Sequence, residues 1–157
     1  MVHEGETEVE RLDRNWDDIL QELRVTQTGT QILLGFLLTI PFQQRFSSLD
    51  AEQLGLYLVL VAVAAIATIL ALTPVALHRA LFRHGSKPRL VPLANLLLRF
   101  ALGAVGLTLS GAVVLIFDVV LGFAAALVAG SITLALVGLG WVLLPALIRR
   151  APAAGRP

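Results

Sequence analysis

The chain has 157 residues, 57% of them apolar and 15% charged, and a net charge of +1. A soluble domain is typically about 45–50% apolar and about 25% charged, so this composition favours a single domain that folds in lipid. The small net charge provides no basic surface for nucleic acid. The absence of cysteine excludes disulfides, thiolate metal sites and a cysteine nucleophile.

Residues 1–24 are predicted to be an acidic cytoplasmic segment that forms an amphipathic helix. This helix begins around Glu8. Its apolar side chains alternate between spacings of three and four residues, the pattern of a narrow helix seam. The seam consists of Val9, Leu12, Trp16, Ile19 and Leu23. Eight of the chain's eleven acids also lie in the first 22 residues: Glu4, Glu6, Glu8, Glu10, Asp13, Asp17, Asp18 and Glu22.

Three arrangements of this N-terminal helix stay open: it lies on the membrane, pairs with a helix of a partner protein, or packs against the protein's own cytoplasmic loop. Helices that lie on membranes usually carry lysine and arginine on their polar face, which attract anionic lipid. An acidic face therefore favours packing against protein. The basic segment 79–99, in the same subunit or the next, supplies the opposite charge.

The first transmembrane span, residues 25–42, is predicted to continue the N-terminal helix. Its predominantly apolar part, Ile32–Phe42, has only 11 residues, whereas about 17–25 residues are needed to cross a bilayer. The span must therefore include the polar residues that follow Val25. A kink at Gly29 is the alternative, and Pro41 lies where the helix can end.

Three further spans are predicted, so the fold class is an all-α integral membrane protein with four transmembrane helices. Residues 54–77 contain no charge and form a helix about 36 Å long, enough for a hydrocarbon core of about 30 Å. Thr73-Pro74 predicts a local kink near the end of this span. The apolar stretch Asn95–Ile148 fits two helices, 95–117 and 123–147, joined by a turn at Asp118–Gly122. Together the spans form a domain over residues 25–148, and residues 149–157 are expected to be a disordered basic tail.

Cations in the short loops place both termini in the cytoplasm. The side opposite the termini has only Arg45, whereas the predicted cytoplasmic side carries Arg79, Arg83, Lys87, Arg89, Arg149 and Arg150. Arginine outnumbers lysine eleven to one in a chain rich in alanine, leucine, valine and glycine, which favours a GC-rich bacterial genome. The predicted location is the bacterial cytoplasmic (inner) membrane, with a multi-pass topology.

Polar groups on one face of the first span are the strongest candidates for function. They follow spacings of three and four residues and so share a helix face: Arg24, Gln27, Thr28, Gln31 and Gly35. Because unpartnered amides in hydrocarbon are costly, this face is expected to meet another helix or water. Two interpretations stay open: the face lines a pore or vestibule, or its glutamines form hydrogen bonds between helices.

Carboxylates and small residues complete the candidates. The four predicted spans contain no aspartate or glutamate. This argues against an ion-coupled antiporter, because such carriers need a titratable group at membrane depth. Asp118 lies at the outer end, either as a turn residue or with a direct role. Small residues at four-residue spacing permit close helix approach, in part within a homo-oligomer: Gly106 and Ser110 in the third span, and Gly122, Ala126 and Gly130 in the fourth.

Neither a cofactor nor a metal site is predicted. His78 and His84 are six residues apart, whereas a helical metal pair is spaced by four. The sequence also lacks a glycine-rich phosphate loop, a nucleophile elbow and paired carboxylates, so an enzyme is not expected.

Three segments carry a resemblance to a known family: Glu10–Trp16 (ERLDRNW), Leu20–Gly29 (LQELRVTQTG) and Thr73–Arg79 (TPVALHR). From about residue 9 to about residue 148 the chain resembles a family of small four-helix membrane proteins, found mostly in actinobacteria and classed as a domain of unknown function. The resemblance implies the four-helix fold and a bacterial source. Some members carry an automatic sodium/proton antiporter label.

The expected function is a homo-oligomeric ion or small-solute pathway in the lipid bilayer, with Gln27, Thr28 and Gln31 lining its cytoplasmic half. The alternative is a non-transporting accessory or scaffold subunit whose acidic helix binds a cytoplasmic or membrane partner. A role in envelope maintenance without transport is not separable from this alternative by sequence.

Overall fold

The computed structural model describes residues 8–81 and 87–150, and for residues 8–13, 15, 81 and 87–89 it describes the backbone alone. Every regular element in these ranges is helical. Four stretches are long and apolar enough to cross a membrane: Trp16–Phe42, Ala51–Ala80, Leu90–Leu121 and Phe123–Arg150. The predicted all-α class with four membrane-length helices is therefore confirmed.

The first helix, α1, runs without interruption over Glu8–Thr39. Its polar middle stays helical through Gly29, because a helix satisfies its own backbone in lipid whatever its side chains. Pro41 lies at the start of the short 3₁₀ helix η1 (Ile40–Phe42), where α1 has ended. A second 3₁₀ helix, η2 (Gln44–Ser48), completes the connection to α2.

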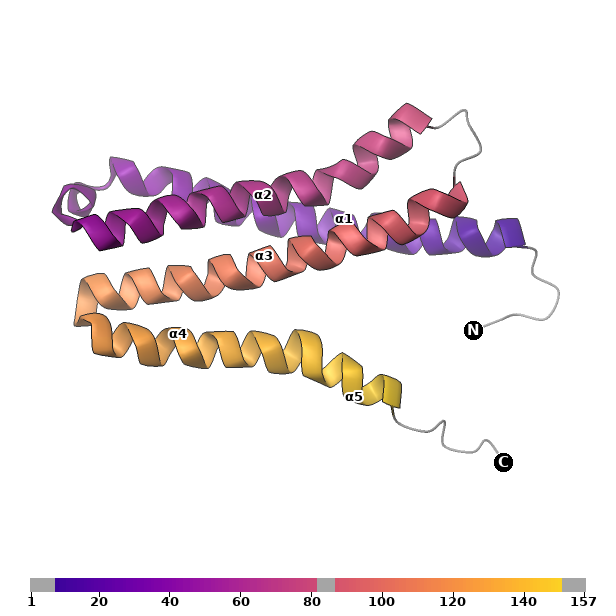
Figure 1. Cartoon of the computed structure of the whole chain (residues 1–157). Helices are drawn as coiled ribbons and strands as arrows, with labels where there is room; N and C mark the ends of the chain where they lie inside the picture. The colour runs from indigo at the N-terminus through magenta and orange to yellow at the C-terminus, as the bar shows by residue number, and fades with distance from the viewer. Residues whose placement is uncertain (1–7, 82–86, 151–157) are drawn as a thin grey trace.

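The second helix, α2 (Ala51–Leu81), begins with a capping box. The carboxylate of Asp50 accepts hydrogen bonds from the backbone N–H groups of Glu52 and Gln53, both at 2.9 Å, and the Gln53 side chain accepts one from the Asp50 N–H. Pro74 lies inside the helix, and the last turns of α2 bend away from α3 (Figure 1). The bend follows from the missing proline N–H.

The third helix, α3, spans Lys87–Leu121 and differs from the prediction at both ends. It starts eight residues before Asn95, so that part of the predicted basic loop is helical. At the other end Asp118–Leu121 is helical too, and Gly122 alone reverses the chain. Gly122 has a φ of +88°, which glycine adopts without the penalty that a Cβ would bring. A one-residue reversal makes the predicted five-residue turn unnecessary.

The last span consists of α4 (Phe123–Gly138), a π-helical turn η3 (Leu139–Leu143) and α5 (Leu144–Arg150). The N–H of Leu144 donates to the carbonyl of Leu139, five residues back. Pro145 follows directly and would clash with the carbonyl four residues before it in a regular helix. The wider turn accommodates this proline and bends α5 away from α3 (Figure 1).

Consecutive long helices run antiparallel. Helix α1 begins and α5 ends at the same end of the molecule, which we call the terminal end (Figure 1). The opposite turn end holds η1, η2 and Gly122. Helix α1 packs against α2 and α3, whereas α4 packs only against α3 among the described helices. In their most apolar stretches, 28% of the residues are buried in the span Ala51–Ala80 and only 6% in the last span, Phe123–Arg150. Helix α4 is therefore a peripheral element.

Candidate functional site

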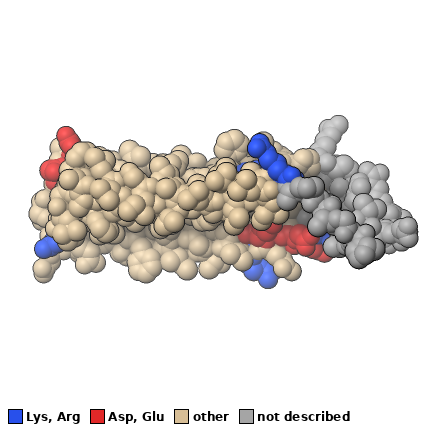
Figure 2. Space-filling view, turned by 90° about the horizontal axis from the view of Figure 1, so that it is seen from below, with Lys and Arg blue, Asp and Glu red and all other residues tan. Residues whose placement is uncertain are grey.

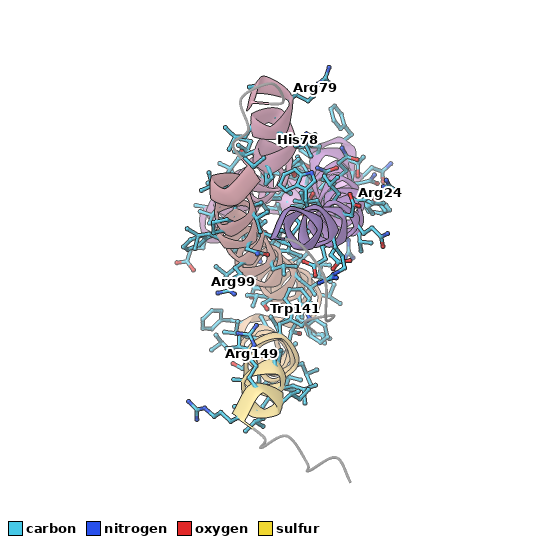
Figure 3. All side chains as sticks on the ribbon, turned by 90° about the vertical axis from the view of Figure 1, so that its right-hand side faces the viewer. Arg24, His78, Arg79, Arg99, Trp141 and Arg149 are labelled. Atoms are coloured by element: carbon cyan, nitrogen blue, oxygen red, sulfur yellow. The ribbon has the colours of Figure 1, made fainter. Side chains whose placement is uncertain are left out.

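A polar stripe runs along the outside of α1. It consists of Arg24, Thr28, Gln31 and Gly35, all of which are exposed. The Thr28 hydroxyl donates to the Arg24 carbonyl at 2.9 Å, and a Cβ built on Gly35 would meet no atom within 4 Å. The Gln31 amide makes no hydrogen bond to any described residue. In Figure 3 Arg24 points away from the packed helices.

The depth of Gln31 makes its exposure costly. It lies nine residues before Ile40 and seven after Arg24, which is about 14 Å and about 10 Å along a helix with a rise of about 1.5 Å per residue. In a membrane crossed by α1, its amide would therefore lie near the middle of a hydrocarbon core of about 30 Å. An unpartnered amide at that depth needs water or another polar group.

Gln27, which the sequence placed on the same face, turns inward instead. Its side-chain Nε2 donates to the carbonyl oxygen of Ala71 on α2 at 3.2 Å. Ala71 lies three residues before the buried Pro74, in the turn that the proline loosens. The structure thus divides the predicted polar face: Gln27 joins two helices, and the polar stripe remains outside.

Among the described residues, the one buried polar side-chain atom without a hydrogen-bond partner is the indole nitrogen of Trp16. The buried polar side chains are Thr30, Thr108 and Ser110. Each hydroxyl donates to a carbonyl of its own helix, at 3.0, 2.8 and 2.8 Å. Hydroxyls satisfied in this way leave the interior of the chain apolar, in contrast to the outside of α1.

Asp118 belongs to a network at the turn end, far from the polar stripe. Its carboxylate accepts a hydrogen bond from Gln53 Nε2 at 2.9 Å. Gln53 is also part of the α2 capping box with Asp50, so one side chain joins the start of α2 to the end of α3. Gln53 was missed in the sequence, although the Asp50-x-x-Gln53 spacing before an apolar run is a signal for such a cap.

The N-terminal seam packs within the chain. Trp16, Ile19 and Leu23 are buried in a cluster with residues of α3: Leu90, Val91, Ala94 and Leu98. Val75 and Leu77 of α2 pack against the same cluster. The side chains of Val9 and Leu12 lie outside the described residues. This contact is apolar, and the acidic residues Asp17, Asp18 and Glu22 remain exposed. Acidic side chains gather on this part of the surface in Figure 2.

Most of the predicted small residues lie between α3 and α4 of one chain. Gly106, Ser110, Ala126 and Gly130 are buried there. A Cβ on Gly106 would lie 2.8 Å from Val137 and 3.5 Å from Trp141, and one on Gly130 would collide with Val114. Gly122 makes the reversal instead. Gly111, which the sequence patterns did not indicate, packs so closely against Leu60 of α2 that a Cβ at this position would collide with the leucine side chain.

No group of three histidine, cysteine, aspartate or glutamate side chains suited to a metal occurs in residues 8–81 and 87–150 as far as side chains are described. His3 and His84 fall outside those residues. His78 contacts Trp16 by ring stacking.

Comparison with known proteins places the chain in a family without assigning it an activity. No curated protein and no solved structure matches the chain. A family model described as "Family of unknown function (DUF6328)" matches residues 5–145, nearly the whole sequence. The chain therefore belongs to this family of unknown function, DUF6328.

Proposed function

We propose that this protein works as a homo-oligomer whose subunits share a water-accessible path for ions or small solutes, lined by the polar stripe of α1. The observation that carries the proposal is Gln31, an exposed amide at mid-membrane depth without a partner in the described chain. Lipid tails cannot satisfy this group, so either water or a neighbouring subunit must do so.

The path is placed between subunits because the interior of each subunit is apolar. Thr30, Thr108 and Ser110 use their hydroxyls within their own helices. The polar stripe, in contrast, is exposed on the surface of α1. Several copies with this side facing a common axis would line that axis with Arg24, Thr28 and Gln31. The exposed Gly35 leaves room where α1 helices approach most closely.

The orientation that goes with this proposal puts the terminal end in the cytoplasm of a bacterium, in the inner membrane. Arg79, Arg149 and Arg150 lie in the last helical turns at that end, whereas Arg45 is the one described cation of the turn end. This asymmetry follows the positive-inside rule. Arg24 would then lie at the cytoplasmic mouth of the path.

Electrical recording of the purified protein in planar bilayers tests the path. We expect the wild type to conduct and Gln31→Leu to lower the conductance roughly tenfold or more, because an apolar constriction tends to lose its water. Gln44→Leu is the matched control, since it removes an exposed amide of the turn end. Equal conductance of the wild type and Gln31→Leu would refute the path through the polar stripe.

The absence of native cysteine allows a second test of the same arrangement. In membranes, Gln31→Cys is expected to react with water-soluble thiol reagents and to cross-link between subunits. Leu134→Cys, exposed on α4, should do neither if that face meets lipid. Cross-linking of Gln31→Cys without reagent access and without conductance would show an oligomer that has no path.

A second candidate is an accessory subunit that binds a protein partner through the outer face of the N-terminal half of α1. The exposed acids Asp17, Asp18 and Glu22 favour it, because none of them forms an ion pair with a described residue. The described part of the apolar seam does not serve this role, since Trp16, Ile19 and Leu23 are buried against α3. Triple replacement of these acids by asparagine should abolish partner binding and leave conductance unchanged if this candidate is correct.

A further inference from the structure

A second feature lies at the turn end, away from the polar stripe. A pocket of about 330 Å³ opens between the connection from α1 to α2 and the last turns of α3. Its lining is apolar apart from Gln43 and Arg45. The apolar lining residues are Ile40, Phe46, Leu49, Leu115, Ile116, Val119 and Val120.

The walls of this pocket are held in place by contacts on both sides. The Phe46 ring meets the Tyr57 ring edge-on, with centroids 5.2 Å apart. Tyr57 itself is buried, and its hydroxyl donates to the Leu37 carbonyl at 3.0 Å. On the α3 side Leu115 is buried in the same cluster as Tyr57. The pocket is therefore part of the folded structure and does not depend on a loose loop.

The rim of the pocket carries unused hydrogen-bond donors. The side chains of Arg45 and Gln43 are exposed and form no hydrogen bond or ion pair with described residues. Two acids of the turn end are engaged elsewhere, since Asp50 caps α2 and Asp118 accepts from Gln53, whereas Glu52 is exposed in the first turn of α2. A guanidinium and an amide at this rim match a phosphate group in charge and in hydrogen bonding.

The depth of the pocket matches a lipid. The turn end is one boundary of the membrane-length helices, so Arg45 lies at headgroup level. Leu115 lies about 5 Å deeper along α3 than Asp118, given a rise of about 1.5 Å per residue. The pocket thus leads from a cationic rim into the apolar layer of the membrane. A phospholipid changes in the same order, from its charged phosphate to its apolar acyl chains.

We propose that this pocket binds a phospholipid of the leaflet at the turn end, with its phosphate on Arg45 and Gln43 and the start of one acyl chain between η1, η2 and α3. Binding is independent of oligomerisation and of the path along α1. A bound lipid would contact both the connection from α1 to α2 and helix α3, and would thereby stabilise the packing of this connection against α3.

Native mass spectrometry of the full chain in detergent tests this site with phosphatidylglycerol as the probe. We expect one phosphatidylglycerol to stay bound to each chain. Arg45→Gln should weaken its binding about tenfold, the usual loss for one charge-assisted hydrogen bond. Ile116→Trp, which fills the pocket from an exposed position, should weaken it as well. Arg149→Gln, the matched charge loss at the terminal end, should have no effect.

Further probes separate the possible occupants. Diacylglycerol lacks the phosphate, and equal binding of it would overturn the role of Arg45. Inorganic phosphate that displaces the lipid at millimolar concentration would overturn the acyl-chain contact. A dimer that disappears in Arg45→Gln, with no lipid bound to the wild type, would show that the pocket holds a second copy. Equal thermal unfolding of wild type and Arg45→Gln without lipid ensures that the variant is folded.

Discussion

The indole ring of Trp16 stacks on the imidazole ring of His78, with centroids 4.8 Å apart and an angle of 19° between the ring planes. Trp16 comes from the N-terminal half of α1, and His78 lies one turn after Pro74 in α2. The indole N–H is buried and has no hydrogen-bond partner among the described residues. Trp16 therefore holds α1 to the bundle by packing, together with Ile19 and Leu23.

Trp16→Ala should release the N-terminal half of α1 from the bundle. Truncating a buried aromatic side chain typically costs about 3–5 kcal/mol of unfolding free energy. Limited proteolysis in detergent should then cut the chain near residue 20, where we expect the wild type to resist cleavage. Val25→Ala changes an exposed apolar residue of the same helix and should leave the cleavage pattern unchanged. Identical patterns for both variants would contradict the role given to Trp16.

Gln27→Leu should destabilise the contact between α1 and α2. The lost hydrogen bond to Ala71 is worth about 0.6–2 kcal/mol between membrane helices. Unfolding by titration with a denaturing detergent measures this difference. Gln31→Leu serves as the internal comparison, because the Gln31 amide bonds to no described residue. In a monomeric preparation Gln31→Leu should not lower stability. An equal loss of stability in both variants would show that the hydrogen bond from Gln27 to Ala71 does not contribute to it.

Gly122→Ala should strain the reversal between α3 and α4. Gly122 has φ +88° and ψ 169°, a region that only glycine occupies readily, and a residue forced into it costs about 1–3 kcal/mol. Gly103→Ala should have the opposite sign, since Gly103 is helical with open space around it and alanine is favoured by up to about 1 kcal/mol. Opposite shifts in unfolding temperature are the expected result, whereas a shift of the same sign would argue against a special backbone at Gly122.

Gly106→Ala should push α4 away from α3. The new Cβ would lie 2.8 Å from the Val137 methyl group, and overpacking of this kind costs about 1–3 kcal/mol. The double variant Gly106→Ala with Val137→Ala restores the space and should regain most of that stability. A double-mutant cycle on unfolding free energies isolates this coupling. Strictly additive effects would mean that the two side chains do not meet.

Sequence patterns predicted the candidate site only in part. Spacing placed Gln27 and Gln31 on one face of α1, but Gln27 lies at an edge of that face, about 40° around the helix from Gln31, so that the rotation of the helix decides whether Gln27 points inward. The hydrogen bond from Gln27 to Ala71 joins residues 44 apart, and helical periodicity carries no information about such a partner. Gly111 was missed for the same reason, because Leu60 comes from another helix.

The number and the helical type of the spans follow from the sequence by itself, because the preference of an apolar segment for lipid depends on that segment alone. The end of α1 shortly before Pro41 and the reversal at Gly122 are local in the same sense. Only the tertiary structure decided that α1 buries Trp16 and leaves Gln31 outside, and that α4 packs against α3 and not against the described parts of α1 and α2. These choices depend on packing between distant residues, where side-chain shape and close approach at glycine select one arrangement among many with the same hydrophobic pattern.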